Sequence, residues 1–435
     1  MKDIKILLPE KEIPTTYLNI SYYLKKFMNK LPDPPLNPVT KSPVKAEDLV
    51  AIFPSELINQ EMSHEREIRI PDKVRELYRM YRPSPLFRAR KLERYLQTPA
   101  HIYYKYEGNN PSGSHKLNTA LAQAYYNKKE GVKALITETG AGQWGTALSL
   151  ACNYFGIACE VFMVRVSYDQ KPYRRVLMEI FNGRVHASPS SLTQYGRKVL
   201  NLDPKSPGSL GIAISEALEV VMKKKNSRYA LGSVLNHVLL HQTIVGQELK
   251  KQMEIVGEMP DVIVGCCGGG SNFAGVVFPF LADQLMGGKK IRYVGTEPDS
   301  CPSLTKGQYR YDFGDASGMT PLLKMKTMGA GHIPSPSHAG GLRYHGMAPL
   351  ISFLHSEKLI EAKSYSQNDI FNAGAEFARI EGIVPAPESA YAIKGAIDEA
   401  LTCRDEGKKK VIVLNLSGHG LLDLKGYDDF LKRKI

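Results

Sequence analysis

A lysine at the start of a predicted helix has the chemistry of a nucleophile. Lys116 follows Ser114 and His115, and apolar residues recur at helical spacing from Leu117 onward, so Ser114 is a candidate N-cap. The positive end of a helix disfavours a cation, which makes an amine there easier to deprotonate and better able to attack a carbonyl carbon. Taken alone, such a lysine is more often a surface charge, and His115 is more often structural than a phosphate donor.

Three glycine-rich segments follow predicted buried strands. Residues 138–143 read E-T-G-A-G-Q after a strand at 134–137, residues 268–272 read G-G-G-S-N after a strand at 262–265, and residues 417–420 read S-G-H-G after a strand at 411–416. Ligands of an open parallel sheet bind at the carboxyl ends of its strands. We therefore expect the three segments and Lys116 to meet at one site.

The middle segment is suited to an anion. Its glycines let backbone N–H groups surround a phosphate, the following helix start adds positive potential, and Ser271 and Asn272 supply side-chain donors. The segment contains neither G-K-[ST] nor G-x-G-x-x-G, which argues against the two common nucleotide-binding loops. A phosphate cradle is favoured, with a plain tight turn as the alternative.

The outer segments add a carboxylate and a neutral hydroxyl. Glu138 in a cleft could act as a general acid or base, or it could cap the helix that follows. The N–H groups of residues 139–143 could hold a substrate carboxylate. Ser417 could donate to a pyridine nitrogen without supplying negative charge, which favours elimination at a β carbon over transamination; a serine in a turn is the plainer alternative. A lysine, a phosphate cradle, a carboxylate and a neutral hydroxyl are the parts of a pyridoxal phosphate site.

Alternating strands and helices must position these groups. The sequence predicts strands at 133–137, 158–164 and 184–187, then at 262–265, 292–296 and 411–416, with helices between them such as 239–254. This alternation predicts an α/β fold with two mostly parallel sheets flanked by helices and a cleft between them. The proline-rich residues 1–60 are expected to form an extended arm with a short helix near 18–28. The aperiodic, aromatic stretch 297–366 is expected to form an ordered wall of the site.

Composition narrows the class of function. The chain has 435 residues, 43% of them hydrophobic, which suits two domains. Its net charge is +13, and the lysines and arginines are scattered along the sequence. This distribution favours a solvated surface or an anionic ligand. A basic nucleic-acid-binding protein is the alternative from another functional class. The six cysteines form no C-x-x-C pair and predict no metal site. The sequence has no signal peptide and no apolar run of membrane length, so we expect a cytoplasmic protein without membrane contact.

Six strings together resemble one family. They are R-P-S-P-L at 82–86, G-S-H-K-L-N at 113–118, E-T-G-A-G-Q at 138–143, G-G-G-S-N at 268–272, E-G-I-V-P-A at 381–386 and L-S-G at 416–418. In this order they resemble the tryptophan synthase β chains, which are fold type II pyridoxal phosphate enzymes. Trp144, the long N-terminal arm and the 301–347 region resemble the second, longer class of these chains, found widely in archaea.

The resemblance implies two domains with pyridoxal phosphate in the cleft between them. The implied N-terminal domain comprises residues 1–81 and 115–235, and the C-terminal domain comprises 82–114 and 236–435. Lys116 would be the covalent anchor and the base at Cα, and Glu138 would be the second catalytic residue. The residues implied to bind the cofactor are His115, Lys116, Gly268, Gly269, Gly270, Ser271, Asn272, Glu381 and Ser417. Those implied to bind the amino acid are Thr139, Gly140, Ala141, Gly142 and Gln143.

The implied reaction is the condensation of indole with L-serine to give L-tryptophan. Arg343 could instead accept an anionic donor such as O-phosphoserine, and a serine dehydratase of the same fold is a further alternative. The resemblance also implies a homodimer, leaves open a monovalent cation, and allows weak or transient contact with the tryptophan synthase α chain.

Overall fold

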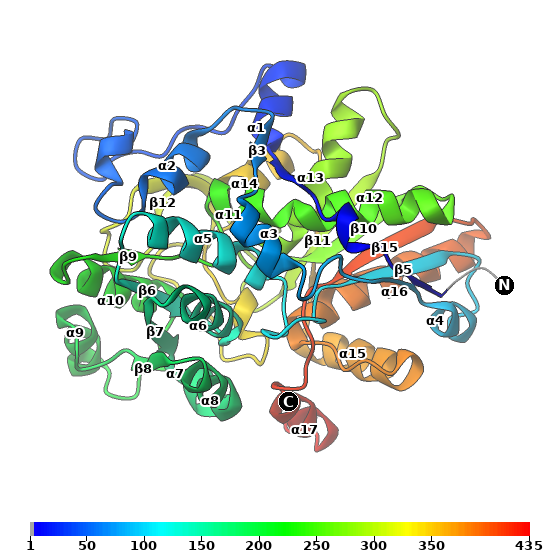
Figure 1. Cartoon of the computed structure of the whole chain (residues 1–435). Helices are drawn as coiled ribbons and strands as arrows, with labels where there is room; N and C mark the ends of the chain where they lie inside the picture. Colours follow the sequence, from blue (N-terminus) through cyan, green and yellow to red (C-terminus); the bar gives the residue numbers. More distant parts are fainter. Residues whose placement is uncertain (1–3) are drawn as a thin grey trace.

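The smaller of two main sheets holds four parallel strands. The computed structural model describes residues 4–435, and its elements are labelled in Figure 1. The strand order is β8 (Gly183–Ser188), β7 (Ala158–Val164), β6 (Ala134–Thr139) and β9 (Ser227–Tyr229). Leu135 of β6 packs in the core that holds α6 (Gln143–Phe155), whereas Ile136 packs in the core that holds α10 (Leu210–Lys223). Helices therefore bury both faces, as a parallel sheet requires.

The larger sheet holds seven strands. Their order is β1 (Lys5–Ile6), β4 (Leu86–Arg88), β5 (His101–Tyr106), β15 (Val411–Leu416), β10 (Val262–Cys266), β11 (Arg292–Pro298) and β14 (Glu361–Tyr365). The strands from β5 to β14 are parallel, and β1 and β4 add an antiparallel edge. Ile263 packs in the core with α13 (Ser271–Leu285), and its neighbour Val264 packs on the opposite face with α16 (Pro387–Glu406). The predicted fold class, two mostly parallel sheets flanked by helices, is confirmed.

The stretch 297–366 is ordered, as expected, but it contains strands that the sequence does not predict. β12 (Gln308–Phe313) pairs antiparallel with β13 (Leu322–Thr327), and η4 (Gly340–Leu342), α14 (Pro349–Ser356) and β14 follow. Met325 of β13 is fully buried in the cluster that contains Ile214 of α10 and Tyr344. The hairpin therefore packs against the helix layer of the smaller sheet.

The N-terminal segment is a packed layer rather than an extended arm. Its elements are η1 (Glu10–Glu12), β2 (Thr16–Leu18), α1 (Ile20–Tyr23), the π-helical turn η2 (Leu24–Met28), η3 (Ala46–Asp48) and α2 (Ser55–Met62), and β2 pairs with β3 (Glu67–Arg69). The short helix expected near 18–28 is confirmed. Tyr17, Leu24 and Leu57 are buried in the same core as α13, which corrects the expectation of an extended arm. β1 also belongs to the larger sheet.

The remaining helices connect and cover the sheets. They are α3 (Asp72–Tyr78), α4 (Arg90–Tyr95), α5 (Leu117–Lys129), α7 (Arg165–Gln170), α8 (Pro172–Ile180), α9 (Gln194–Leu202), α11 (Asn236–Gln242), α12 (Ile244–Val256), α15 (Gln367–Glu381) and α17 (Leu424–Leu431). The single helix predicted over 239–254 is divided at Thr243. The Thr243 hydroxyl donates to Leu240 O at 2.7 Å and accepts from Leu18 N at 3.0 Å, so it offers the backbone a local alternative to the helix.

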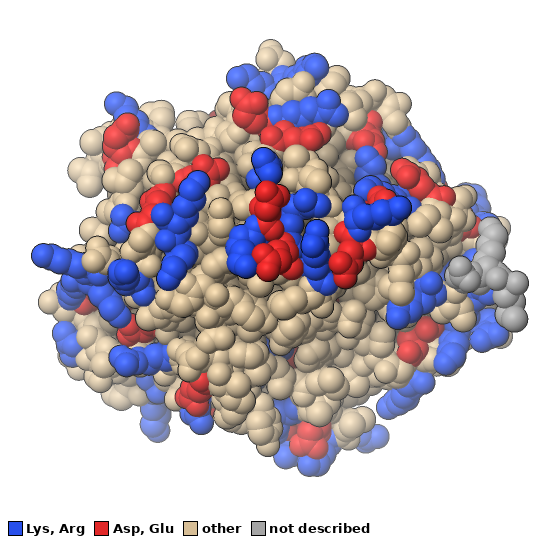
Figure 2. Space-filling view, viewed as in Figure 1, with Lys and Arg blue, Asp and Glu red and all other residues tan. Residues whose placement is uncertain are grey.

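The surface carries a mixed distribution of charge. Figure 2 shows Lys and Arg side chains dispersed over one face and interspersed with Asp and Glu, and they form no continuous basic track there. Across residues 4–435, no helix is both long and apolar enough to cross a bilayer. The same residues contain no group of three or more His, Cys, Asp and Glu side chains arranged to hold a metal ion.

Candidate active site

The three predicted segments meet at two adjoining cavities. Ser271 and Ser417 line the first cavity, and Glu138 and Tyr344 line the second. The residues that line both are Lys116, Gln143, Ser233, Gly269 and Gly341. β10 and β15 end just before their glycine-rich segments, and β6 ends within its own at Thr139, so the carboxyl edges of both sheets supply the walls.

Lys116 stands where the two cavities join, immediately before α5. Its Nζ donates to Gly232 O at 3.1 Å. Burial lowers the pKa of Lys116 from 10.5 to about 8, although the nearby Glu138 and Glu388 oppose the change. Part of the amine is therefore neutral, the nucleophilic form, at mildly alkaline pH. The prediction that Ser114 is the N-cap is wrong, because Lys116 holds that position. The Ser114 hydroxyl has no hydrogen-bond partner among residues 4–435.

The loop 268–272 forms a cradle at the start of α13. Gly270 has φ +93°, a left-handed conformation that favours glycine, and Ser271 begins the helix. The N–H groups at this helix start have no partner within the helix and are available to an anion. The Asn272 side chain donates to Cys266 O at 2.7 Å, so it braces the loop and leaves its backbone N–H for a ligand. Asn272 lines the first cavity, and its role as a side-chain donor to a ligand stays a prediction.

His115 lies beside the cradle as a neutral group. Its Nε2 is 3.3 Å from Ser271 Oγ, and its Nδ1 is 3.4 Å from Ser417 O. Burial, followed by the charge of Lys116, lowers the pKa of His115 to about 3. At neutral pH the ring can therefore donate one hydrogen bond but supplies no charge.

Three buried polar atoms of the first cavity have no hydrogen-bond partner within the described part of the chain. They are Ser114 Oγ, Ser233 Oγ and Glu388 Oε2. Buried polar groups are normally satisfied, so these atoms are suited to a polar ligand. A Cβ on Gly268 would lie 2.5 Å from Gly341 O, so the loop wall leaves no space for a side chain. The cradle, the unpartnered atoms and Lys116 fit a phosphorylated pyridine aldehyde, pyridoxal phosphate.

The hydroxyl of Ser417 contacts two uncharged side chains. Its hydroxyl is 2.9 Å from Ser389 Oγ and 3.6 Å from Cys266 Sγ. Burial raises the pKa of Cys266 to about 11, so the thiol is uncharged at neutral pH. No carboxylate is hydrogen-bonded to the Ser417 hydroxyl, which agrees with the sequence-based prediction of a neutral donor for a pyridine nitrogen.

Glu138 is only 3% exposed and lines the second cavity. The Tyr229 hydroxyl donates to its Oε2. Burial raises the pKa of Glu138 to about 7, although the Tyr229 hydrogen bond and Lys116 favour the ionised form. Both forms of the carboxyl are thus populated near neutral pH, as a residue that alternates between general acid and general base requires.

The segment 139–143 joins β6 to α6. Gly142 has φ +98° and is the N-cap of α6, and Thr139 Oγ1 accepts from Gly145 N at 3.1 Å. The predicted substrate residues Thr139, Gly140, Ala141 and Gln143 line the second cavity. Gly142 is not among the lining residues, because it packs against Arg174, where a Cβ would lie 2.9 Å from the arginine Cβ.

Glu381 lies away from both cavities. It ends α15, and its carboxylate accepts from Leu92 N at 2.9 Å. The carboxylate that lines the first cavity is Glu388, whose Oε1 accepts from Gly341 N at 2.8 Å. Glu388 lies in the first turn of α16, directly after Pro387, and a proline is typical of a helix start. That signal would have favoured Glu388 over Glu381, and the expectation for Glu381 is corrected.

Arg343 lies behind the second cavity. It follows η4, whose Gly340 and Gly341 line that cavity, but Arg343 itself lines neither of the two cavities. Its Nη2 donates to Ser167 Oγ at 3.0 Å, and its Nε has no partner in residues 4–435. Burial lowers the pKa of Arg343 below its ordinary value. The structure thus places this cation next to the site without bringing it into contact with the second cavity.

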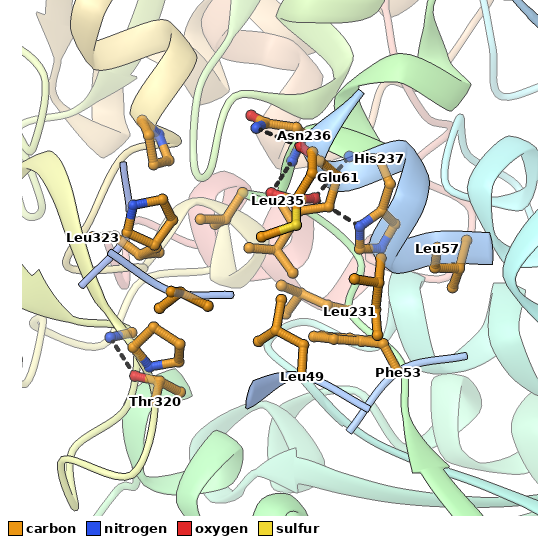
Figure 3. A pocket seen from close by; sticks show the side chains of 18 of the residues that line it. Leu49, Phe53, Leu57, Glu61, Leu231, Leu235, Asn236, His237, Thr320 and Leu323 are labelled. Atoms are coloured by element: carbon orange, nitrogen blue, oxygen red, sulfur yellow. Dashed lines mark hydrogen bonds and ion pairs between the residues drawn. The ribbon is translucent and has the colours of Figure 1, made fainter. Parts of the chain in front are cut away.

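A larger apolar cavity adjoins the second one and has a volume of about 430 Å³. Figure 3 shows Leu49, Phe53 and Leu231 projecting into it, with Glu61 and His237 at one edge. The residues that line both it and the second cavity are Ile214, Leu231, Val234 and Tyr344. Sequence reasoning missed this cavity because its walls come from the N-terminal segment, α10, the residues before α11 and the β12–β13 hairpin.

Sequence comparison identifies close relatives over the whole chain. Residues 77–418 match the family model described as pyridoxal-phosphate dependent enzyme. The chain is 57% identical to tryptophan synthase beta chain 2 of Methanosarcina mazei, over 100% of this chain and 98% of that protein. It is 59% identical to the protein of the same name from Thermotoga maritima, over 98% and 99%, and 58% identical to that of Aquifex aeolicus, over 99% of each.

Comparison with solved structures supports the fold. The processed threonine deaminase isoform 2 of Solanum lycopersicum has a TM-score of 0.60 at 18% identity, covering 92% of this chain and 96% of that one. The L-serine ammonia-lyase of Rhizomucor miehei has a TM-score of 0.59 at 16% identity, covering 82% and 99%. At these identities the likeness concerns the architecture alone.

Proposed function

The chain belongs to the tryptophan synthase β chains within the pyridoxal-phosphate-dependent enzyme family, and we propose that it is a lyase that condenses indole with L-serine to give L-tryptophan and water. The observation that carries the proposal is the position of Lys116, between a cavity suited to the cofactor and a cavity that contains Glu138. Bound pyridoxal phosphate supplies an electron sink for negative charge at Cα of the amino acid.

The residues of the first cavity would hold the cofactor. Lys116 would be the covalent anchor, the N–H groups of 268–272 with Ser271 would bind the phosphate, and Ser417 would donate to the pyridine nitrogen. Ser114 Oγ and Ser233 Oγ would gain the partners that they lack within residues 4–435. Neutral His115 would add a donor beside the phosphate.

Lys116 and Glu138 would then transfer the protons of the reaction. Lys116 takes the proton from Cα of serine. Glu138 in its acid form gives a proton to the β hydroxyl, which leaves as water. Indole forms the new carbon–carbon bond at the β carbon and gives its surplus proton to the Glu138 carboxylate, and Lys116 returns the proton to Cα. A carboxyl with a pKa of about 7 can serve in both roles at neutral pH.

The apolar cavity suits the aromatic co-substrate. It is lined by aliphatic and aromatic side chains and adjoins the cavity that holds Glu138. An indole that enters from it would meet the carboxyl without crossing water, which would disfavour hydrolysis to pyruvate.

The identity of the amino acid donor is a separate part of the proposal. We propose serine, held by the N–H groups of residues 139–143 at the start of α6. The alternative donor, O-phosphoserine, would need Arg343 to move from Ser167 toward the second cavity. A serine dehydratase is the remaining alternative, and the adjoining apolar cavity favours the synthase over it.

We also propose a cytoplasmic homodimer that contacts an α chain weakly or transiently. The six cysteines are all buried and unpaired, which suits a reducing compartment. Sedimentation of the purified protein, alone and with an α chain, would test the assembly. A protein that sediments as a monomer at working concentration would contradict the dimer.

Spectroscopy and product analysis test the function. The purified protein supplied with pyridoxal phosphate should become yellow and should make tryptophan from indole and serine. The Lys116→Ala variant should do neither, whereas Lys129→Ala, at the far end of α5, should do both. A protein that makes pyruvate from serine but no tryptophan from serine plus indole would be a dehydratase, and one that needs phosphoserine would overturn the proposed donor.

A further inference from the structure

Tyr229 lies between the apolar cavity and the cavity of Glu138. It is the last residue of β9 and is 3% exposed. Its side chain lines the apolar cavity, and its hydroxyl donates to Glu138 Oε2. Tyr229 thus connects the surface that is open to an apolar ligand with the carboxyl that is proposed to move protons.

The strand register explains how the tyrosine reaches the carboxyl. Tyr229 is the register partner of Ile136 on the parallel neighbour β6. Side chains two residues apart on a strand share a face, so Ile136, Glu138 and Tyr229 all lie on the α10 side of the smaller sheet. A long side chain at position 229 therefore spans the distance to the carboxyl two residues further along β6.

The hydrogen bonds of Glu138 distinguish its two oxygens. Tyr229 donates to Oε2, and Thr137 Oγ1 approaches the same oxygen at 3.5 Å. The other ionisable groups that face the carboxyl are Lys116, at the N-cap of α5, and Tyr344, in the segment after β13. The Tyr344 hydroxyl donates to Gly314 O at 2.9 Å, so Tyr229 is the tyrosine that donates to the carboxyl.

We propose that Tyr229 is a positioning residue for the reaction: its hydroxyl holds Glu138 Oε2 against β9 and stabilises the ionised carboxylate, which leaves Oε1 to exchange protons with the substrate. The proposal rests on the role of Glu138 in the proposed function. A hydrogen bond donated to a carboxylate favours the ionised form, so loss of the hydroxyl should raise the pKa of Glu138 above about 7.

The Tyr229→Phe variant tests the proposal through the ionisation of Glu138. A hydrogen bond donated to a carboxylate favours its ionised form, so loss of the Tyr229 hydroxyl should shift the midpoint upward by roughly one pH unit or more. Infrared difference spectra of the full-length protein, assigned by subtraction of Glu138→Gln, report that midpoint directly. In the holoenzyme, the pH profile of kcat for tryptophan formation should shift in the same direction. At pH 7 an upward shift of about one unit lowers the ionised fraction of Glu138 about fivefold, and kcat should fall by the same factor because the ionised carboxylate must accept the proton from indole.

A matched tyrosine–glutamate pair supplies the control. The Tyr103 hydroxyl donates to Glu258 Oε2 at 2.8 Å, and neither residue lines the cavities at Lys116. Tyr103→Phe should leave both the infrared midpoint of Glu138 and the kcat profile unchanged. If Tyr229→Phe does not fold, fluorotyrosine at position 229 tests the same point in the opposite direction, because the more acidic phenol is a stronger donor and should lower the midpoint.

The outcomes separate the proposal from the function on which it rests. A midpoint for Glu138 that is the same with tyrosine, phenylalanine and fluorotyrosine at position 229 would overturn the positioning role. A shifted infrared midpoint in a protein that makes no tryptophan would support the role of Tyr229 and contradict the proposed function instead.

Discussion

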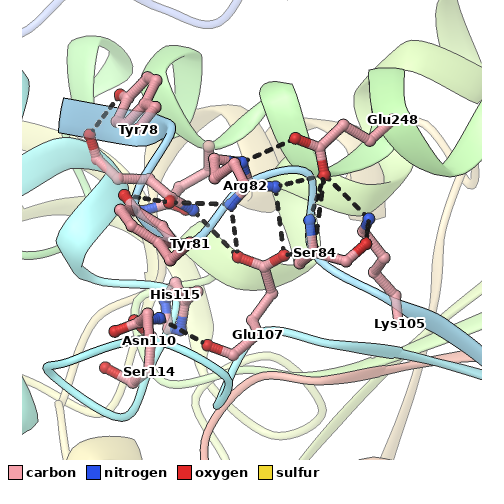
Figure 4. A network of polar contacts seen from close by, with 12 residues as sticks. Tyr78, Tyr81, Arg82, Ser84, Lys105, Glu107, Asn110, Ser114, His115 and Glu248 are labelled. Atoms are coloured by element: carbon pink, nitrogen blue, oxygen red, sulfur yellow. Dashed lines mark hydrogen bonds and ion pairs between the residues drawn. The ribbon is translucent and has the colours of Figure 1, made fainter. Parts of the chain in front are cut away.

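Arg82 and Glu248 form a bidentate ion pair in which both side chains are fully buried. Arg82 Nε lies 2.8 Å from Glu248 Oε1, and Nη2 lies 2.8 Å from Oε2. Arg82 follows α3, and Glu248 belongs to α12, so the pair joins segments 166 residues apart in the sequence. Figure 4 shows Glu107 and Lys105 on the same network. Two cations and two anions thus neutralise one another in the interior.

The same network reaches the helix that carries Lys116. Arg82 Nη1 donates to Asn118 Oδ1 at 2.9 Å, and Asn118 Nδ2 donates to Glu107 Oε2 at 3.2 Å. Burial alone would raise the pKa of Glu107, but the charge and hydrogen bonds of Arg82 outweigh it and lower that pKa to about 2. Asn118 lies in the first turn of α5, so the network fixes the start of the helix next to Lys116.

Replacement of Arg82 should therefore cost more stability than replacement of any exposed cation. Arg82→Met leaves two buried carboxylates without their main partner, and such a loss costs about 3–5 kcal/mol. Lys30→Met, which removes the exposed ion pair with Glu357, should cost less than about 1 kcal/mol. Urea unfolding of both variants measures the difference. Equal unfolding midpoints for the two variants would contradict a structural role for the buried network.

Glu138→Gln should stabilise the protein at alkaline pH while it lowers activity. The pKa of Glu138 is about 7 in the folded chain and 4.5 ordinarily, so the folded state holds its proton more tightly. Between these values stability falls as the pH rises, because the unfolded state ionises first, and the full cost is roughly 3 kcal/mol above pH 7. Glutamine cannot ionise and avoids that cost. Urea unfolding should show a gain near pH 8.5 and little difference near pH 4.5.

Glu258→Gln is the control with the opposite sign. Burial would raise the pKa of Glu258, but hydrogen bonds from Tyr103 and His101 outweigh it and lower the pKa below its ordinary value. Its contribution to stability is therefore present above the unfolded pKa and is lost as the pH falls through the folded pKa. Glutamine at position 258 should destabilise the protein near pH 8.5. A destabilising effect of Glu138→Gln at that pH would refute the burial cost assigned to Glu138.

Gly268→Ala should weaken cofactor binding. The added Cβ would lie 2.5 Å from Gly341 O and 3.0 Å from Leu342 Cα, both backbone atoms, so the cradle loop must shift. A displaced loop should lower the affinity for pyridoxal phosphate by about tenfold, or about 1.4 kcal/mol. Gly331→Ala is the matched control, because no described atom lies within 4 Å of its added Cβ. Titration with pyridoxal phosphate, followed by absorbance, would show equal affinities if the loop tolerates the methyl group.

The sequence predicts the parts of the fold whose signals are local. The strand expected at 158–164 is β7 to the residue, and the strands before the three glycine-rich segments are present at β6, β10 and β15. These strands are short apolar runs bounded by glycine or polar residues, and they are buried on both faces. The segments at 268–272 and 417–420 meet because β10 and β15 end at the same edge of the larger sheet, whereas their meeting with 138–143 depends on how the two sheets pack.

The remaining features depend on contacts between distant segments. β12 and β13 carry too many polar residues for a buried strand, and they pack only because α10 and Tyr344 cover Met325. Which helix end faces the site depends on contacts between distant segments, and the proline before Glu388 is the local signal that favours Glu388 over Glu381. The hydrogen bond between Tyr229 and Glu138 depends on the pairing of β9 with β6. The two residues are 91 positions apart, and no local sequence pattern predicts that these strands are neighbours.

Asp423 should fix the loop 139–143 of the second cavity by holding Arg174, although Asp423 itself does not line that cavity. Its carboxylate accepts from Lys171 Nζ at 2.6 Å and from Arg174 Nη2 at 2.9 Å, and all three side chains are buried. Arg174 packs against Gly142 at the N-cap of α6. Asp423→Asn keeps the shape of the side chain but leaves two buried cations without a counter-charge. It should therefore destabilise the protein by about 3–5 kcal/mol at pH 7 and raise KM for serine more than it lowers kcat.

The pH dependence distinguishes charge from shape at Asp423. Burial would raise the pKa of Asp423, but Lys171 and Arg174 outweigh it and lower the pKa below 3.8. The stability difference between Asp423→Asn and the parent protein should be full above pH 3.8 and should vanish as the pH falls through the folded pKa, where the parent also loses its charge. Asp428→Asn removes an exposed ion pair with Lys432 on α17 and should change stability little. If Asp423→Asn and Asp428→Asn give the same unfolding midpoint and the same KM for serine, the carboxylate of Asp423 does not hold Arg174 against the loop.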